Sequence, residues 1–295
     1  MWSLNRMDEA HCNLGIMVSL ALLATCGTPS ATPTDLPTTG ADSIPAPTAS
    51  PSLDAGAAQV AAIDGMVLVY IPMGELLMGS TDSDSNAYAG ESPQQRIYLD
   101  AFWIDQTEVT NTMYARCVQA GACQPSAQTK SYTREAYYGT PQYANYPAIF
   151  VTWFDAQTYC QWAGGQLPTE AQWEKAARGT DGWAYPWGMA EPDRNLLNFN
   201  LQVGDTTEVG RYPGGASPYG VLDMAGNAWE WVADWYDPNY YVRSPQRNPT
   251  GPDHGLGRVM KGGSWNVAGR NVRAAVRGRR TPDYRYDNVG FRCAR

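Results

Sequence analysis

The 295-residue sequence predicts a loop-rich α+β domain with little regular secondary structure. Three observations predict this class. Short strand-like runs come first, three helices with capping signals follow, and Gly, Pro, Asn, Asp and aromatic residues dominate from Thr180 onward. With 43% hydrophobic residues, 11 Trp and 18 Tyr but only 5 Phe, the chain can bury one aromatic core. We therefore expect a single globular domain over residues 61–295.

The N-terminus resembles an export signal. Residues 14–24 are apolar but too short to span a bilayer, and they end in the sequence LATC, which resembles a bacterial lipoprotein box. Residues 1–26 are therefore predicted to be a signal peptide with Cys26 as the lipidated residue. Acidic residues at positions 8 and 9 are unusual in such a segment, so a plain cleaved signal or an uncleaved anchor stays open. In either case we expect an extracytoplasmic protein, and lipidation would make it a membrane-anchored bacterial lipoprotein.

Residues 27–60 are predicted to be a disordered tether. They are rich in Pro, Thr, Ala and Ser and contain no aromatic residue, so they cannot bury enough apolar surface to fold. This composition predicts a flexible spacer that holds the domain away from a membrane.

The expected strands lie in the apolar runs 66–72, 74–79 and 95–104. Thr110 is then expected to cap a helix that runs towards residue 120, with Val109 positioned to pack against Tyr114. Thr152 precedes a second helix over 153–163, which two glycines end. Thr169 has the spacing of a capping box for a third helix, which is expected to end at residues 178–179. We expect the long loops that follow to be stabilised by disulfides or bound cations.

Charge is divided unevenly along the chain. Residues 258–295 hold 10 Lys or Arg against 2 Asp, a net charge of +8, whereas residues 61–257 hold 10 basic and 22 acidic residues, a net charge of −12. We therefore expect the basic C-terminal segment to be balanced by the acidic remainder. A nucleic-acid-binding tail is the alternative, but the overall charge of −8 argues against it.

Cysteine usage indicates structural disulfides in an oxidising compartment. Without Cys12 and Cys26, four cysteines remain, and four cysteines allow three pairings. Cys117 and Cys123 flank Gly121, a residue type that ends helices, and can close a small loop, which would leave Cys160 to pair with Cys293. A metal site or redox dithiol is the rival interpretation, but no Cys-x-x-Cys spacing exists.

Four motifs resemble the formylglycine-generating enzyme (sulfatase-modifying factor) family: LPTEAQWE at 167–174, GVLDMAGNAWEW at 220–231, RVMKGGSW at 258–265 and NVGFRC at 288–293. The resemblance implies that family's fold, which is related to the C-type-lectin-like fold, and a link between Cys160 and Cys293. It also implies oxidation of a sulfatase cysteine by a copper-binding cysteine pair just after Gly-Gly-Ser. Residues 265–273 contain no cysteine, so copper is not expected here and the family's activity is in question.

The resemblance implies two structural calcium sites. The first set is the Asp223 side chain, the Gly226 and Ala228 carbonyls and the Glu230 side chain, and two carboxylates around a glycine turn are suitable hard ligands. Glu230 could instead be a solvent-exposed residue between two core tryptophans. A second set, less closely matched, is Asn198, the Phe199 carbonyl, Asp205 and the Thr207 carbonyl, for which an Asx turn without an ion is the alternative.

Catalytic residues cannot be assigned from the sequence. His254 is the only histidine outside the leader, so neither a three-histidine iron centre nor a zinc site is expected. Ser264 has no base beside it in the sequence. The segment after Gly-Gly-Ser instead offers Arg, Asn and Trp side chains that suit a polar or anionic ligand, such as a peptide carboxylate or a sugar. The candidate ligand contacts are Trp265, Asn266, Arg270 and Arg273.

Three functions follow from these patterns. The favoured one is an exported, membrane-tethered, monomeric binding or accessory module that has lost the oxidase centre and binds a protein or polar ligand, not nucleic acid. The second is a formylglycine-generating oxidoreductase, or a related enzyme, that works by another route. The third is a retroelement-diversified ligand-binding protein, because residues 266–269, 284 and 286–288 could all arise from asparagine codons by changes at adenine.

Overall fold

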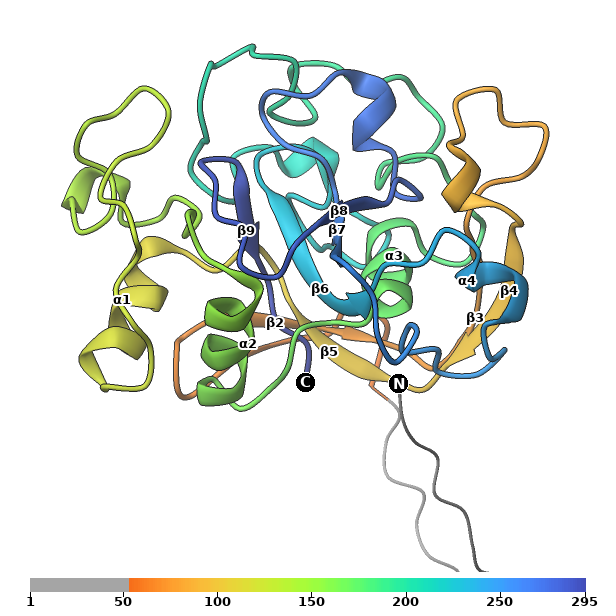
Figure 1. Cartoon of the computed structure of the whole chain (residues 1–295), viewed down its shortest axis with the longest axis horizontal. Helices are drawn as coiled ribbons and strands as arrows, with labels where there is room; N and C mark the ends of the chain where they lie inside the picture. The colour runs from red at the N-terminus through yellow and green to blue at the C-terminus, as the bar shows by residue number, and fades with distance from the viewer. Residues whose placement is uncertain (1–52) are drawn as a thin grey trace, which may run out of the picture. The chain divides into compact units, whose positions relative to one another are not determined.

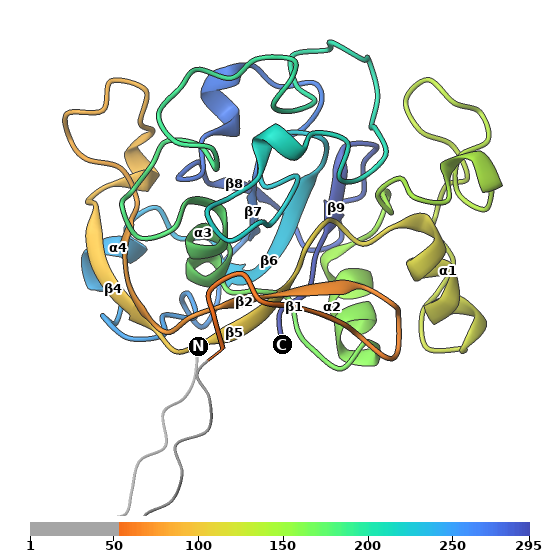
Figure 2. The same ribbon diagram turned by 180° about the vertical axis from the view of Figure 1, so that it is seen from behind.

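The computed structural model describes residues 53–295, so the predicted signal peptide, Cys26 and most of the predicted tether lie outside the described residues. Figure 1 shows that both ends of the described chain lie at the foot of the domain, and Figure 2 shows the same arrangement from behind. Long loops and the 3-10 helix η4 (Gly269–Val272) occupy the opposite end. No helix within 53–295 is both long and apolar enough to cross a membrane.

The three predicted helices are confirmed. They are α1 (Asn111–Gln119), α2 (Trp153–Trp162) and α3 (Glu170–Arg178). Thr152 and Thr169 each form a complete capping box, and Gly179 ends α3 with a φ of 69°. Local hydrogen bonds therefore fix where these helices begin. A further short helix, α4 (Tyr240–Arg243), lies in the region that was predicted to be loop.

The strands form three small sheets. The first has the order β1-β2-β5, with β1 (Ala58–Val60), β2 (Val67–Ile71) and β5 (Phe102–Asp105) all antiparallel. The second pairs β3 (Gly74–Met78) with β4 (Gln95–Leu99). The run 95–104, which was predicted to supply strands, is divided between β4 and β5, because the chain passes from the second sheet to the first at residues 100–101.

A third sheet of order β8-β7-β6-β9 carries the family motifs. Its strands are β6 (Trp229–Trp235), β7 (Arg258–Lys261), β8 (Gly278–Arg280) and β9 (Val289–Phe291), and β9 runs parallel to β6. These strands were not among the predicted ones. Strand β6 lacks the usual alternation of buried apolar and exposed polar residues. Its neighbours Glu230 and Trp231 are both fully buried.

The predicted start of the domain at residue 61 is too late. Residues 58–60, which fall in the predicted tether, form β1 and pair with Val67, Leu68 and Val69 of β2. All three residues of β1 are exposed, so the strand is held by main-chain hydrogen bonds and leaves no hydrophobic pattern in the sequence.

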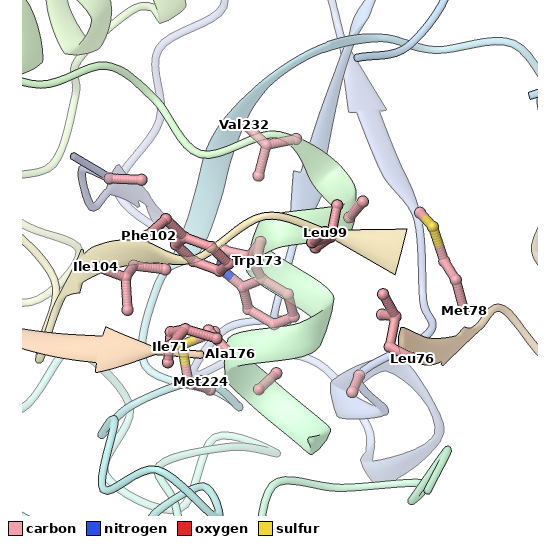
Figure 3. Close-up of a cluster of buried hydrophobic side chains, with 14 of the residues drawn as sticks. Ile71, Leu76, Met78, Leu99, Phe102, Ile104, Trp173, Ala176, Met224 and Val232 are labelled. Atoms are coloured by element: carbon pink, nitrogen blue, oxygen red, sulfur yellow. The ribbon is translucent and has the colours of Figure 1, made fainter. Parts of the chain in front are cut away.

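The core is centred on α3. Figure 3 shows the Trp173 ring of this helix among Ile71, Phe102 and Val232, side chains that come from two different sheets. The indole is fully buried, and its Nε1 donates a 2.7 Å hydrogen bond to Glu230 of β6. Helix α3 therefore packs against both the third sheet, through β6, and the first sheet, through β2 and β5.

Both predicted disulfides are present. Cys117 is bonded to Cys123 at the end of α1, and Cys160 of α2 is bonded to Cys293, 133 residues later. The longer link ties α2 to the C-terminal segment that follows β9. In the chain-entropy description, closing so long a loop stabilises the folded state by about 5 kcal/mol.

Candidate functional site

The segment after the Gly-Gly-Ser block lies at the end of the domain away from the chain ends (Figure 1). Gly262 and Gly263 have φ values of 89° and 76°. A Cβ on Gly263 would lie 2.7 Å from the Asn271 carbonyl oxygen, so no larger residue fits this turn. The two glycines thus fold the chain leaving β7 back on itself and hold residues 264–273 against the body of the domain.

Ser264, Asn266 and Asn288 form a closed hydrogen-bond network. Ser264 Oγ donates to Asn266 Oδ1 at 2.8 Å, and Asn288 Nδ2 donates to the same oxygen at 3.0 Å and to Ser264 Oγ at 3.2 Å. Ser264 is fully buried, while Asn266 is partly exposed. The network joins the segment after Gly-Gly-Ser to the start of β9 and presents an amide at the surface.

Trp265 was predicted to contact a ligand, but its side chain is only 1% exposed. The indole Nε1 donates a 3.5 Å hydrogen bond to the Asp287 carbonyl, and the Tyr132 ring packs over it at a centroid distance of 5.0 Å. Tyr132 is 63% exposed and presents an aromatic ring to solvent where Trp265 was expected to. The Trp265 ring therefore supports the surface instead of forming it.

Arg273 is also buried, which corrects its prediction as a free ligand contact. Its guanidinium donates hydrogen bonds of 2.8 and 2.9 Å to the two carboxylate oxygens of Glu91, and a third to the Asn86 carbonyl. Such a bidentate pair leaves few donors for a ligand. Arg273 therefore anchors the 84–91 loop to the segment after Gly-Gly-Ser.

Arg270 is the exposed arginine of this segment. Its guanidinium lies over the Tyr88 ring, 4.1 Å from the ring centroid, and Nε donates to the Asn86 carbonyl. The Tyr88 hydroxyl in turn donates to Asn271 Oδ1 at 2.6 Å. We call Asn266 and Arg270, with the rings of Tyr88 and Tyr132, the loop-end surface, which the buried Ser264 and Asn288 support from below. It offers one amide, one cation and two exposed aromatic rings.

The first predicted cation site lies in a buried carboxylate cluster. Glu230 accepts two hydrogen bonds of 2.7 Å from Arg292, and Asp223 accepts one of 2.6 Å from the Gly210 amide. Burial raises the pKa of Asp223 to about 6, and burial together with the charges of Asp223 and Glu230 raises the pKa of Glu108. Three carboxylates thus share one guanidinium, so the cluster is short of positive charge.

That shortage is compatible with a bound cation. Asp223, Gly226 and Ala228 lie in the turn before β6 and Glu230 lies at the start of that strand; Asp223 and Gly226 have positive φ values of 58° and 77°. Hard oxygen donors in such a turn suit calcium. No group of three or more His, Cys, Asp or Glu side chains within residues 53–295 is arranged to hold a metal, so carbonyl oxygens would have to complete the set.

The second predicted set combines one buried oxygen that has no partner within residues 53–295 with a carboxylate that, like Glu230, is already paired. Asn198 Oδ1 is buried and has no hydrogen-bond partner among the described residues, which leaves one oxygen available. The Asp205 carboxylate, however, accepts hydrogen bonds from Ser131 and Thr133 and pairs with Arg134 at 3.2 Å. Phe199 and Thr207 are both buried beside these residues. As placed, Asp205 is satisfied by protein donors.

The charge division of the sequence is explained by buried ion pairs. Arginines of the basic C-terminal segment pair with acidic residues of the remainder, as we expected. These pairs are Arg273 with Glu91, Arg277 with Glu170, Arg292 with Glu230, and Arg295 with Asp64 and Asp105. The partners themselves were not predicted, because composition reports the balance of charge and not which residues meet.

The segments of the diversification hypothesis meet in space, since Asn266 contacts Asn288. Their positions are not uniformly exposed: Asp287 and Asn288 are 8% and 9% exposed, whereas Ala268 and Tyr286 are open to solvent. Tyr284 and Tyr286 stack on each other at 5.7 Å. Variation at the buried positions would disturb the network that holds Ser264.

The fold and the Gly-Gly-Ser segment define an α+β domain of the formylglycine-generating-enzyme type. A solved structure of PvdO from Pseudomonas aeruginosa has a TM-score of 0.70 and 24% identity and covers 83% of this chain and 99% of that one. Treponema denticola variable protein 1 has a TM-score of 0.66 and 21% identity over 81% of this chain and 98% of that one. A sequence model of the sulfatase-modifying factor enzyme 1-like domain matches residues 54–295, so the chain belongs to this family.

Related proteins carry different names. Serine/threonine-protein kinase pkn1 of Chlamydia caviae is 37% identical over 244 residues, which cover 77% of this chain and 38% of that protein. The chain thus spans well under half of pkn1. The formylglycine-generating enzyme of Streptomyces coelicolor is 33% identical over 77% of this chain and 88% of its own length. The inactive C-alpha-formylglycine-generating enzyme 2 of Mus musculus is 32% identical, and the match covers 77% of this chain and 85% of that protein.

Proposed function

We propose that this domain is a binding module of the family, in which the loop-end surface recognises a polar or anionic ligand and no cysteine is oxidised. The observation that carries the proposal is the chemistry after Gly-Gly-Ser. Residues 265–273 contain no cysteine, and all four cysteines within residues 53–295 are in disulfides. A copper-binding thiolate pair therefore has no source in the described part of the chain.

The loop-end surface supports recognition. Asn266 offers an amide, Arg270 a guanidinium, and Tyr88 and Tyr132 exposed aromatic rings. Arginine pairs with carboxylates, amides bond hydroxyl groups, and aromatic rings stack on the apolar faces of sugars and peptides. The ligand class that fits is an acidic sugar or a peptide with a carboxylate.

The site is held rigidly, which favours binding. Arg273 and Glu91 fix one border of the loop-end surface, and the Ser264–Asn266–Asn288 network fixes the other. A preorganised surface loses little conformational entropy when a ligand binds. The relative named an inactive formylglycine-generating enzyme 2 agrees with loss of the oxidase reaction within this family.

We also propose export and a lipid anchor at Cys26. Two disulfides suit an oxidising compartment. The first described residues lie at the end of the domain opposite η4, so the chain enters the domain away from the loop-end surface (Figure 1). Replacing Cys26 by Ala should release the protein from membranes. Unchanged membrane attachment of that variant would rule out lipidation but not export.

A structural calcium ion is the third part of the proposal. Asp223 and Glu230 would supply carboxylate oxygens and Gly226 and Ala228 would supply carbonyl oxygens. Calcium would add the positive charge that the cluster with Glu108 lacks. The ion would hold the turn before β6, and no chemical step is assigned to it.

Ligand capture tests the binding function. Purified residues 53–295 are applied to arrays of neutral and uronic-acid glycans and of peptides with free or amidated C-termini. We expect capture of acidic members, lost in Arg270→Gln and in Tyr132→Ala. Arg211→Gln, at an exposed arginine elsewhere, is the matched control. Capture that is absent, or equal in all four proteins, would contradict binding at the loop-end surface.

A further inference from the structure

A second pocket, separate from the loop-end surface, lies where β6 ends, β7 begins and β8 ends. Its volume is about 590 Å³, which is within the range of small-molecule sites. It is lined from three chain segments: 236–238 after β6, 254–257 before β7, and 279–281 at the end of β8. Because two of these segments flank paired strands, the position of the pocket is fixed by the third sheet.

Two arginines give the pocket its charge. Arg279 and Arg280 line it, are exposed, and form no ion pair with any carboxylate of the described residues. They differ in this from Arg273, Arg277 and Arg292 of the same segment, which are all paired in the interior. The acidic residue that lines the pocket, Asp237, is paired with Arg243. The pocket therefore carries excess positive charge on a chain whose net charge is −8.

Aromatic rings hold both guanidinium groups. Arg279 lies 5.0 Å from the centroid of the Tyr236 ring, and Arg280 lies 5.2 Å from that of Tyr284. The Tyr236 ring is itself contacted by the buried Arg277, at 4.8 Å. Such contacts limit the conformations of long side chains and so reduce the entropy that is lost when a ligand binds.

The remaining lining is partly apolar and partly polar. Leu256, which is 95% exposed, and Pro238 are the apolar lining residues, while His254 and Thr281 add ring and hydroxyl groups. An exposed leucine in a pocket wall has an apolar surface that a ligand could cover. An extended peptide that paired with the edge strand β8 is a less favourable ligand. The Arg279 carbonyl of this strand already accepts a 2.8 Å hydrogen bond from Arg280 Nη1.

From these observations we propose that this pocket binds a small organic anion, whose carboxylate or phosphate oxygens pair with Arg279 and Arg280 and whose apolar part covers Leu256. Arginine donates two parallel hydrogen bonds to either kind of oxyanion. Two guanidinium groups without a carboxylate partner among residues 53–295 attract an anion to this pocket although the whole chain carries a net charge of −8.

The test uses amide NMR spectra of residues 53–295 titrated with citrate, inorganic phosphate and, as an uncharged probe, glycerol. We expect saturable shifts at residues 255–257 and 279–281 with at least one anion and none with glycerol. The anion that binds more tightly identifies carboxylate or phosphate as the preferred group. Added NaCl should weaken binding, because salt screens exposed charges.

Substitutions then assign the binding to the two arginines. Arg279→Gln combined with Arg280→Gln should weaken binding by about tenfold or more. The control pairs Arg211→Gln with Arg194→Gln, which removes the same charge from other exposed positions. Saturable binding with normal affinity in the control supports the pocket. Absence of shifts with both anions, or equal weakening in both double variants, would overturn it, and neither result depends on ligand capture at Arg270.

Discussion

Arg292 donates one hydrogen bond of 2.7 Å to each carboxylate oxygen of Glu230, and neither side chain is exposed to solvent. The same guanidinium donates to the carbonyls of Asp105, Gln106 and Leu222. One side chain thus joins the GNAWEW motif of β6, the end of β5 and the turn before β6. Removal of either partner would leave an unpaired charge in the interior, which is far more costly than loss of a surface pair.

Arg292→Lys keeps the charge but should destabilise the domain by about 1–3 kcal/mol, since one ammonium cannot replace the planar fork of donors and leaves buried acceptors unsatisfied. Urea unfolding followed by tryptophan fluorescence measures the change. Arg279→Lys, at an exposed arginine, is the control and should change stability by less than about 0.5 kcal/mol. If Arg292→Lys lowers the free energy of unfolding by less than about 1 kcal/mol, the ion pair contributes no more to stability than a surface pair does.

The two disulfides should contribute unequally. Replacing Cys160 and Cys293 by Ser opens a loop of sequence separation 133, whereas replacing Cys117 and Cys123 opens one of separation 6. The chain-entropy description gives losses of about 5 and about 2 kcal/mol. Thermal unfolding of the two double variants compares them. Equal melting temperatures would contradict the expected dependence on loop length.

Stability should fall as pH rises from about 4 to about 8 because of Asp234. Burial, with the charge of Glu170, raises the pKa of Asp234 to about 7 despite Arg277 and Arg258 nearby. The unfolded value is about 4, so the folded state holds the proton more tightly. The stability that this group contributes is complete below pH about 4 and is lost as pH rises through about 7.

Asp234→Asn imitates the protonated form and keeps the oxygen that accepts the Glu170 amide hydrogen bond. Its melting temperature should exceed that of the parent protein at pH 8 and match it more closely at pH 5. Burial also raises the pKa of Asp105 to about 7, so some decline remains in the variant. The exposed Asp181→Asn is the control. An unchanged decline in Asp234→Asn would contradict the proposed titration.

Chelation should destabilise the domain if calcium binds through Asp223 and Glu230. A ligand that binds only the folded state adds about 2.7 kcal/mol at a concentration one hundred times its Kd. EDTA should therefore lower the melting temperature of the parent protein, and calcium should restore it. Asp223→Ala should abolish this response. A response that persists in Asp223→Ala but disappears in Asp205→Asn would place the ion at the other predicted set.

Local patterns predicted the features that depend on local contacts. The caps at Thr152 and Thr169 are hydrogen bonds within one turn, so the sequence suffices to place α2 and α3. The Cys117–Cys123 bridge is likewise local, whereas the Cys160–Cys293 link was predicted by elimination and from the family resemblance. β1 was missed because it is stabilised by main-chain pairing with β2 and carries no apolar side chain into the core.

The candidate site could be predicted only in part. Sequence pattern located the segment after Gly-Gly-Ser, but it could not tell that the Trp265 ring turns inward and that Tyr132, from a distant loop, covers it. Arg270 and Arg273 are three residues apart and of one type, yet only Arg273 meets Glu91. Long-range partners decide which side chains stay free, and no local signal identifies them.

Incubation of purified protein with copper, oxygen and a peptide that carries a sulfatase cysteine motif tests most directly whether this family member binds or oxidises. Mass spectrometry of the peptide measures conversion of cysteine to formylglycine, and the Streptomyces coelicolor formylglycine-generating enzyme serves as the positive control. We expect unmodified peptide, because residues 265–273 contain no cysteine and all four cysteines within 53–295 are in disulfides. Formylglycine produced over many turnovers would contradict the binding-module function.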